Sequence, residues 1–305
     1  QKIINMNNII RIATRNSPLA LMQAKMVEAI LKKDAEVNIK PMTSSGDKVS
    51  DKVFKEHGGK GLFLKELEES LLNQETDIAV HSLKDVPAKI SNKFDIITIL
   101  NRENPSDALV SEKYKSVYDL PKNAIIGTSS PRRTSMLRNI SNSFRIINLR
   151  GNIQTRLKKM KEEKMDGIIL AAAGLHRLSM KDKISQYIET DEFVPSAGQG
   201  ILCIEYLKTN KLIKSILKKY KVEAVERCAK EERDFIKQIG GDCMSPIGIH
   251  ASIKNKKIKI KGFVSSLNGE RHIMSAYECG LNENIDVGKH LAKVFISQGA
   301  KKLLK

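Results

Sequence analysis

The stretch Ile9-Ile10-Arg11-Ile12-Ala13-Thr14-Arg15-Asn16-Ser17-Pro18 joins a short apolar run directly to a helix start. Residues 9–13 have the composition of a buried β-strand, and Ser17-Pro18 matches an N-cap followed by the first helical position, which predicts a helix through Leu31. A second stretch, Ala124-Ile125-Ile126-Gly127-Thr128-Ser129-Ser130-Pro131, has the same strand–turn–helix order. The two stretches predict two related α/β lobes, with the alternative that Ser-Pro recurs only because it is a common helix opening.

Further apolar runs and amphipathic segments alternate around these two stretches. Strands are expected at residues 77–80, 145–149 and 167–172, and helices at residues 63–72 and 153–163. From residue 222 onward the pattern changes to a charged helix, two alternating strands and a last helix, at residues 222–239, 247–253, 257–264 and 287–304. These patterns indicate an α/β fold with parallel or mixed sheets, followed by a small α+β domain.

Length and cysteine usage limit the class of protein. At 305 residues the chain exceeds the usual size of one domain, and no apolar run is long enough to span a bilayer. A soluble protein of two or three domains, with no membrane partner, is therefore expected. The four cysteines, Cys203, Cys228, Cys243 and Cys279, form no CxxC pair. We therefore expect no metal site, and we expect free thiols in a reducing compartment.

The formal net charge of +18 indicates an anionic partner, either nucleic acid or a small polyanion. Much of the excess is lysine in short runs of the kind that usually form solvated surface. Tryptophan is absent and aromatic residues make up 5% of the chain, which leaves little for base stacking. No helix-turn-helix, zinc-finger or RNA-binding signature is present. We therefore expect a small anionic ligand and no nucleic-acid partner.

Arginine and serine side chains follow the first strand of each predicted lobe. Arg15 and Ser17 come after the first strand, and Arg132 and Arg133 lie in the first turn of the helix that Ser130 opens. Helix N-termini bind anions through free backbone N–H groups, and guanidinium groups add bidentate geometry. Two arginines in a first turn oppose the helix dipole, which favours an anionic partner that compensates them. The alternative is an ordinary capped helix with surface arginines.

Three more arginines, Arg150, Arg156 and Arg177, lie close to the ends of predicted strands. Lys84 and Asp85 follow the strand at residues 77–80. Ligand crevices of α/β sheets form at the carboxyl ends of the strands. A carboxylate there could transfer a proton or stabilise a developing cation. A simple Lys-Asp surface pair before a turn remains the alternative for Lys84 and Asp85.

Two predicted loops contain the remaining candidate residues. Gly58-Gly59-Lys60-Gly61 lacks the spacing of a phosphate-binding loop, which disfavours nucleotide binding and favours a mobile loop over a crevice. Cys243 lies in Gly240-Gly241-Asp242-Cys243-Met244-Ser245-Pro246, whose composition is that of a loop and not of a packed stripe. A thiol on a flexible loop, together with many guanidinium groups, suits an enzyme that holds a polyanion by a covalent tether.

Seven motifs in this order resemble the hydroxymethylbilane synthase family, also called porphobilinogen deaminase. They are residues 12–20, 58–67, 81–87, 127–133, 149–152 and 197–200 and the loop around Cys243. The resemblance implies two lobes similar to periplasmic binding proteins with a cleft between them, and a small α+β domain that carries the cofactor cysteine. The implied ranges are residues 1–103 plus 198–217, 104–197, and 218–305.

The resemblance also implies the reaction. A transferase of this family condenses four porphobilinogen molecules onto a dipyrromethane cofactor, releases ammonia each time, and then releases the linear tetrapyrrole hydroxymethylbilane by hydrolysis for haem biosynthesis. One covalent cofactor per chain is implied, joined to Cys243 through a thioether. A monomer is implied as well, located in the cytoplasm or, alternatively, in the stroma of a plastid-type organelle.

The residue roles that follow are those implied by the resemblance. Asp85 is the catalytic carboxylate, and Lys60 belongs to the lid or cleft wall. Cofactor contacts are implied for Lys84, Thr128, Ser129, Ser130, Arg132, Arg133 and Arg156. Substrate contacts are implied for Arg15, Ser17, Phe63, Arg150 and Arg177. Pro131, His176 and Asp242 depart from the family pattern.

Two competing functions stay open at the level of sequence. A non-catalytic two-lobed binding protein could use the same arginines for an organic anion, but such a protein would need neither Cys243 nor Asp85. A nucleic-acid binder would instead bind arbitrary DNA with a steep dependence on salt.

Overall fold

The structure is a computed structural model that describes residues 9–43, 64–241 and 244–304. Lys60, Phe63, Asp242 and Cys243 lie outside these described residues. The chain divides into two compact units, Gln1–Asn101 with Ile201–Glu226 and Arg102–Gly200 with Arg227–Lys305. The division into three domains stays a prediction.

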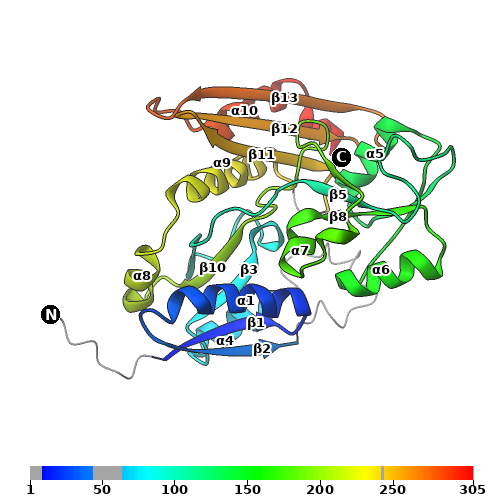
Figure 1. The fold of residues 1–305 in the computed structure, drawn as a ribbon. Coiled ribbons are helices and arrows are strands. Elements are labelled where there is room, and N and C mark those ends of the chain that lie inside the picture. The colour runs from blue at the N-terminus through cyan, green and yellow to red at the C-terminus, as the bar shows by residue number, and fades with distance from the viewer. Residues whose placement is uncertain (1–8, 44–63, 242–243, 305) are drawn as a thin grey trace. The chain divides into compact units, whose positions relative to one another are not determined.

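The first unit contains a five-stranded sheet with the order β2-β1-β3-β10-β4 (Figure 1). Its strands are β1 (Ile9–Arg15), β2 (Glu36–Met42), β3 (Ile78–Ser82), β4 (Phe94–Ile97) and β10 (Leu202–Leu207). Strand β1 pairs in parallel with β2 and β3, whereas β10 is antiparallel to both β3 and β4. The strand expected at residues 77–80 is confirmed as β3.

Helices cover both faces of this sheet. Helix α1 (Pro18–Leu31) begins as predicted, with Ser17 as N-cap accepting a hydrogen bond from the Ala20 N–H and with Pro18 as first residue. Its apolar side chains pack with Ile12 and Ile78. Helix α4 (Lys65–Leu72) packs instead with the neighbouring strand residues Ala13 and Ala79. Because successive strand residues point to opposite faces, α1 and α4 lie on opposite sides of the sheet. Helix α8 (Lys211–Lys218) packs on the α1 side.

The second unit repeats this strand plan in a sheet with the order β7-β6-β8-β5-β9. Its strands are β5 (Asp107–Val110), β6 (Ile125–Gly127), β7 (Arg145–Ile147), β8 (Gly167–Ala171) and β9 (Gln186–Ile188). Three strands are again parallel, and β5 is antiparallel to its neighbours β8 and β9. Helices α5 (Pro131–Ile140), α6 (Ile153–Glu162) and α7 (Ala172–Arg177) pack on it. The shared order confirms the predicted pair of related α/β lobes.

The C-terminal part of the second unit contains the antiparallel strands β11 (Ile247–Lys254), β12 (Lys257–Ser265) and β13 (His272–Gly280). Helices α9 (Glu223–Ile239) and α10 (Val287–Ser297) pack on one face, where the rings of Phe235 and Phe295 meet edge to face at 5.2 Å. This confirms the α+β character of the C-terminal part. The last helix, expected to be continuous, is interrupted by Gly299 with φ +90° before the short α11 (Ala300–Leu303).

The two connections at residues 102–106 and 194–200 are held together within the second unit. The N–H of Glu103 donates to the carbonyl of Gly200 at 3.0 Å, and the Nε of Arg102 donates to the carbonyl of Gln199 at 2.9 Å. Gly200 has φ +86°, and a Cβ atom there would collide with the Glu103 carbonyl oxygen. Glycine is therefore required at this position.

Gly200→Ala should lower the free energy of unfolding by more than about 1 kcal/mol, because it combines left-handed strain with a backbone clash. Gly240→Ala is a matched control, since Gly240 has the same φ of +86° with nothing within 4 Å of an added Cβ. Denaturant unfolding of both variants measures the difference. Equal losses in the two variants would show that the contact with Glu103 has no energetic consequence.

Candidate functional site

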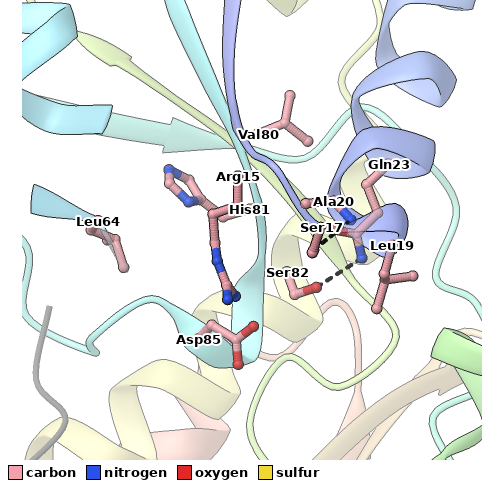
Figure 2. Close-up of a pocket in the computed structure, with 10 residues that line it drawn as sticks. All are labelled: Arg15, Ser17, Leu19, Ala20, Gln23, Leu64, Val80, His81, Ser82 and Asp85. Carbon is pink, nitrogen blue, oxygen red and sulfur yellow. Dashed lines mark hydrogen bonds between the residues drawn. The ribbon is translucent and has the colours of Figure 1, made fainter. Parts of the chain in front are cut away.

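A pocket in the first unit lies where β1 and β3 end and α1 begins. It is lined by Arg15, Ser17, Leu19, Ala20, Gln23, Leu64, Val80, His81, Ser82 and Asp85. Figure 2 shows the side chains of Arg15 and Asp85 extending into this pocket. The pocket thus brings together three residues that the sequence predicted to be functional, Arg15, Ser17 and Asp85. Its position at the carboxyl ends of parallel strands is the one that α/β folds use for ligands.

Local hydrogen bonds hold the walls of this pocket. The Nε2 amide of Gln23 donates to Ser82 Oγ at 2.9 Å, and the Thr14 hydroxyl donates to the Ala20 carbonyl at 3.1 Å. Asp85 ends a single 3-10 turn, Leu83–Asp85, that directly follows β3. The buried side chain of Leu83 anchors this turn, while Asp85 itself is exposed. The carboxylate is therefore presented to solvent from a rigid strand end, and Lys84 precedes it in the same turn.

A buried carboxylate in the second unit binds the two arginines of the α5 first turn. Asp107, at the start of β5, is 0% exposed and accepts from Arg132 at 2.7 and 3.2 Å and from Arg133 at 2.9 and 2.7 Å. Burial alone would raise the pKa of Asp107, but the charges and hydrogen bonds of the two arginines outweigh it and hold the pKa well below its ordinary value. Gln199 adds a hydrogen bond at 3.0 Å.

Asp107 is thus an anionic partner for the paired arginines within the chain itself. Arg132 is 2% exposed and also donates to the Val194 carbonyl at 2.9 Å and to Ser196 Oγ at 3.1 Å. Arg133 donates in addition to the Ile169 carbonyl at 3.1 Å. Sequence reasoning missed Asp107, although an acidic residue at the start of the apolar run Asp107–Val110 was an available signal.

The hydroxyl groups predicted near α5 make local hydrogen bonds. Ser130 caps the helix by accepting from the Arg133 N–H at 3.4 Å, and Thr128 Oγ1 accepts from the Ser130 N–H at 3.3 Å. The Ser129 hydroxyl donates to the Leu149 carbonyl at 2.6 Å. These bonds fix the strand–turn–helix conformation that the sequence predicted.

The remaining predicted arginines lie at two further strand–helix junctions of the second unit. The Nε of Arg156 donates to the Gly151 carbonyl at 2.8 Å, next to the α6 N-cap Asn152. Arg150 is half-buried in the turn after β7. Arg177 donates to the Gly200 carbonyl at 2.8 Å, and burial lowers its pKa to about 10 against the opposing charge of Glu103.

His176 is hydrogen-bonded through both ring nitrogens. Its Nδ1 lies 3.0 Å from Glu103 Oε1, and its Nε2 lies 2.9 Å from the Tyr187 hydroxyl. Glu103 also accepts from the Asn104 N–H at 2.8 Å. The imidazole therefore ties α7 to the connection at residues 102–106, next to Arg177.

Cys203, Cys228 and Cys279 are buried and are not joined in disulfide bonds. Burial, strengthened by the charge of Glu232, raises the pKa of Cys228 to about 12, which disfavours its thiolate. Among the described residues there is no group of three or more His, Cys, Asp or Glu side chains arranged to hold a metal ion. The described helices also include none that is long and apolar enough to cross a membrane.

Comparison with known proteins assigns both parts of the chain to one family. Residues 10–215 match the family model "Porphobilinogen deaminase, dipyromethane cofactor binding domain", and residues 226–297 match "Porphobilinogen deaminase, C-terminal domain". A porphobilinogen deaminase of Campylobacter hominis is 42% identical over 302 residues, covering 98% of each chain. One of Thiobacillus denitrificans is 40% identical over 296 residues, covering 96% of this chain and 97% of the relative.

A solved structure with lower similarity is the L-cystine solute receptor of Neisseria gonorrhoeae. It is 15% identical, with a TM-score of 0.41 over 79% of this chain and 96% of the receptor. The family assignment rests instead on the two matched models and the nearly full-length relatives. The sequence motifs and these matches agree: the chain belongs to the porphobilinogen deaminase family.

Proposed function

We propose roles for individual residues in the reaction of this family, the hydroxymethylbilane synthase activity. The chain is a transferase of porphyrin biosynthesis with a dipyrromethane cofactor. In this reaction four porphobilinogen molecules are condensed with loss of ammonia, and the linear tetrapyrrole is released by hydrolysis. The observation that supports the roles most directly is the common pocket of Arg15, Ser17 and Asp85.

Arg15 and Ser17 bind the carboxylates of incoming porphobilinogen in this proposal. Arg15 supplies a charged donor, and Ser17 lies at the N-terminus of α1, where the helix dipole favours anions. Arg150 and Arg177 bind further substrate carboxylates, and Phe63 and Lys60, which lie outside the described residues, contribute to the substrate site and its lid. Each porphobilinogen carries acetate and propionate groups, which explains the need for several cations.

Asp85 stabilises positive charge in the pocket. Loss of ammonia from porphobilinogen leaves an electron-poor methylene-pyrrole, and a nearby carboxylate lowers the energy of that cation and accepts hydrogen bonds from pyrrole N–H groups. The exposed position of Asp85 at the end of a rigid 3-10 turn suits this role.

The donors of the second unit fit a ligand that carries several carboxylates. We assign cofactor contacts to Thr128, Ser129, Ser130, Arg133 and Arg156 of this unit, and to Lys84 of the first unit. Arg132 is assigned a cofactor contact as well, and because Arg132 and Arg133 are 2% and 6% exposed and both bind Asp107, the two arginines also hold the α5 N-terminus in place. When bound, the dipyrromethane cofactor supplies the pyrrole carbon at which the chain grows.

We also propose that Cys243 carries the cofactor and that the chain is a monomer without nucleic-acid partners. The side chains of Lys158 and Lys161 are 75% and 65% exposed, which supports a solvated surface as the location of many of the lysines. The proposed location is the cytoplasm, with the stroma of a plastid-type organelle as the alternative.

The test of the tether is the intact mass of the purified protein and of its Cys243→Ala variant. We expect the wild-type protein to be heavier than its sequence by two linked pyrrole units, and the variant to have the mass of its sequence. Cys228→Ala is the matched control and should keep the added mass, because Cys228 is buried. An adduct retained by Cys243→Ala would refute the assignment, as would a bare wild-type protein that gains no mass with porphobilinogen.

A further inference from the structure

Three ionisable side chains gather under helix α4, behind the pocket of the first unit. His81 lies on β3, Glu205 on β10 and Glu68 on α4. Ala79 packs against α4, and residues two apart in a strand share a face, so His81 faces α4 as well. Glu205 lies directly opposite Ala79 in the β10–β3 ladder and shares that face. The register of the antiparallel strands β3 and β10 therefore places His81 and Glu205 on the face of the sheet that α4 covers.

The hydrogen bonds of this cluster require a proton on one carboxyl group. His81 Nε2 lies 3.1 Å from Glu205 Oε2, and the two side chains are 6% and 0% exposed. The other oxygen, Glu205 Oε1, is buried and accepts no hydrogen bond from the N–H and O–H groups of the described residues. The carboxyl group of Glu68 lies close enough to that of Glu205 for the charge of Glu205 and a shared hydrogen bond to favour a protonated Glu68. Two carboxyl groups can bond to one another only when one of them is protonated.

The environment identifies Glu68 as the protonated group. Its burial and the charge of Glu205 raise its pKa to about 7, against the opposing influence of His81. A protonated Glu68 could donate to Glu205 Oε1, the oxygen that accepts no other hydrogen bond from the described residues. Glu205 Oε2 remains the partner of His81 Nε2, so both oxygens of the buried Glu205 side chain then have a hydrogen-bond partner.

We propose that Glu68, Glu205 and His81 form a proton-holding chain that positions the His81 imidazole in the wall of the Asp85 pocket. Glu205 fixes the ring orientation and the Nε2 tautomer of His81, as a carboxylate commonly does for a functional histidine. His81 is a positioning residue in this chain, and the inference rests on the proposed role of the pocket. His81 lines the pocket together with Asp85 and Arg15.

Few other charges face Glu68 from the described elements around it. On β1, residues that share the face of Ala13 are Arg11, which is bound to Asp77 at 2.9 Å, and Arg15 at the strand end. On α4 itself, Glu66 is the other half-buried acid, and the exposed Glu69 pairs with Lys65 at 3.9 Å. After His81, the next charged residues of the β3 segment are Lys84 and Asp85.

The pH dependence of stability has a definite sign. The folded-state pKa of Glu68 is raised above its ordinary value of 4.5 to about 7, so the folded chain holds this proton more tightly than the unfolded chain. The contribution of Glu68 to the free energy of unfolding therefore falls as pH rises from 4.5 to about 7 and is constant at higher pH. Above that pH two adjacent carboxylates repel each other beneath α4, and His81 loses its fixed position.

The experiment compares wild type, Glu68→Gln and Glu69→Gln. Glutamine keeps an N–H donor for Glu205 but does not titrate, whereas Glu69→Gln is a matched control on the exposed side of the same helix. We expect the kcat of wild type and of Glu69→Gln to fall as pH rises through about 7. In the pH profile of Glu68→Gln this alkaline decrease in kcat should be absent. An unchanged alkaline limb in Glu68→Gln would overturn the positioning role.

Two measurements separate this inference from the proposed function. Infrared spectra near neutral pH should contain a protonated-carboxyl band that is absent in Glu68→Gln and present in Glu69→Gln. Urea unfolding should show the decline in stability toward neutral pH in wild type and not in Glu68→Gln. Neither measurement depends on turnover. If wild type and Glu68→Gln had the same infrared spectrum and the same pH dependence of unfolding, the proton-holding chain would be refuted even if the enzyme were active. Failure of the proposed function would instead appear as full activity of an Asp85 variant.

Discussion

Replacing Asp85 with asparagine should lower kcat by about 100- to 1,000-fold, the range that loss of one electrostatic contact to a charged transition state commonly produces. Asparagine keeps the size and hydrogen-bonding capacity of the side chain but removes the charge that stabilises a cationic pyrrole. The side chain is exposed at the end of a short 3-10 turn, so the free energy of unfolding should be nearly unchanged. Steady-state consumption of porphobilinogen and denaturant unfolding measure the two quantities.

Asp182→Asn is the matched control for this prediction. Asp182 also lies in a 3-10 turn, Lys181–Lys183, and forms a surface ion pair with Lys183 at 2.8 Å. It therefore has the features of the plain Lys-Asp surface pair that is the alternative for Asp85. We expect Asp182→Asn to keep the wild-type kcat. An Asp85→Asn variant as active as this control would remove Asp85 from the mechanism.

Replacing Asp107 with asparagine should lower the free energy of unfolding by about 3–5 kcal/mol, as expected when one partner of a buried ion pair is removed. Two buried guanidinium groups, Arg132 and Arg133, would lose their shared counterion. An uncharged amide can accept only part of the hydrogen bonds that the carboxylate accepts, and its NH₂ group would face donors. Urea unfolding measures the loss.

Asp191→Asn provides the comparison with a surface ion pair. Asp191 pairs with Lys259 and Lys261 at 3.3 and 3.4 Å and is 62% exposed, so its replacement should cost less than about 1 kcal/mol. The pKa of Asp107 is depressed in the folded chain, so its contribution is present above the ordinary pKa of 3.8 and is lost only in strong acid. A loss in Asp107→Asn no larger than in Asp191→Asn would show that the buried cluster is not stabilising.

Local signals predicted the parts of the fold that depend on a few neighbouring residues. Ser17-Pro18 and Ser130-Pro131 begin α1 and α5 where expected, because an N-cap and a first-turn proline act within one helical turn. Strand β10 was not predicted, since its place between β3 and β4 depends on partners more than a hundred residues away. Strand β13 was missed as well. It is an edge strand whose inward positions, apart from the buried Cys279, are only half-buried, which weakens its alternation.

In the pocket, too, the residues that depend on local signals could be predicted and those that depend on distant partners could not. Arg15, Ser17 and Asp85 could be grouped from sequence because parallel strands end at one edge of a sheet. His81 lay within a recognised motif, but its partner Glu205 is 124 positions away, and no local pattern joins them. The partnership of Asp107 with Arg132 and Arg133 likewise spans 25 and 26 positions. Buried charge pairs of this kind depend on tertiary packing, and the hydrophobic periodicity of the sequence does not predict them.

The strand order of the first sheet also has a consequence for synthesis on the ribosome. Strand β4 has β10 as its neighbour in the sheet, and β10 begins at Leu202. At translation rates of about 5–20 residues per second, the nascent chain would wait roughly 5–20 s after β4 has been made before β10 follows. During that interval an incomplete sheet exposes the edges of β3 and β4. Cells that make this protein would therefore benefit from a chaperone that shields the nascent N-terminal segment until the later strand arrives.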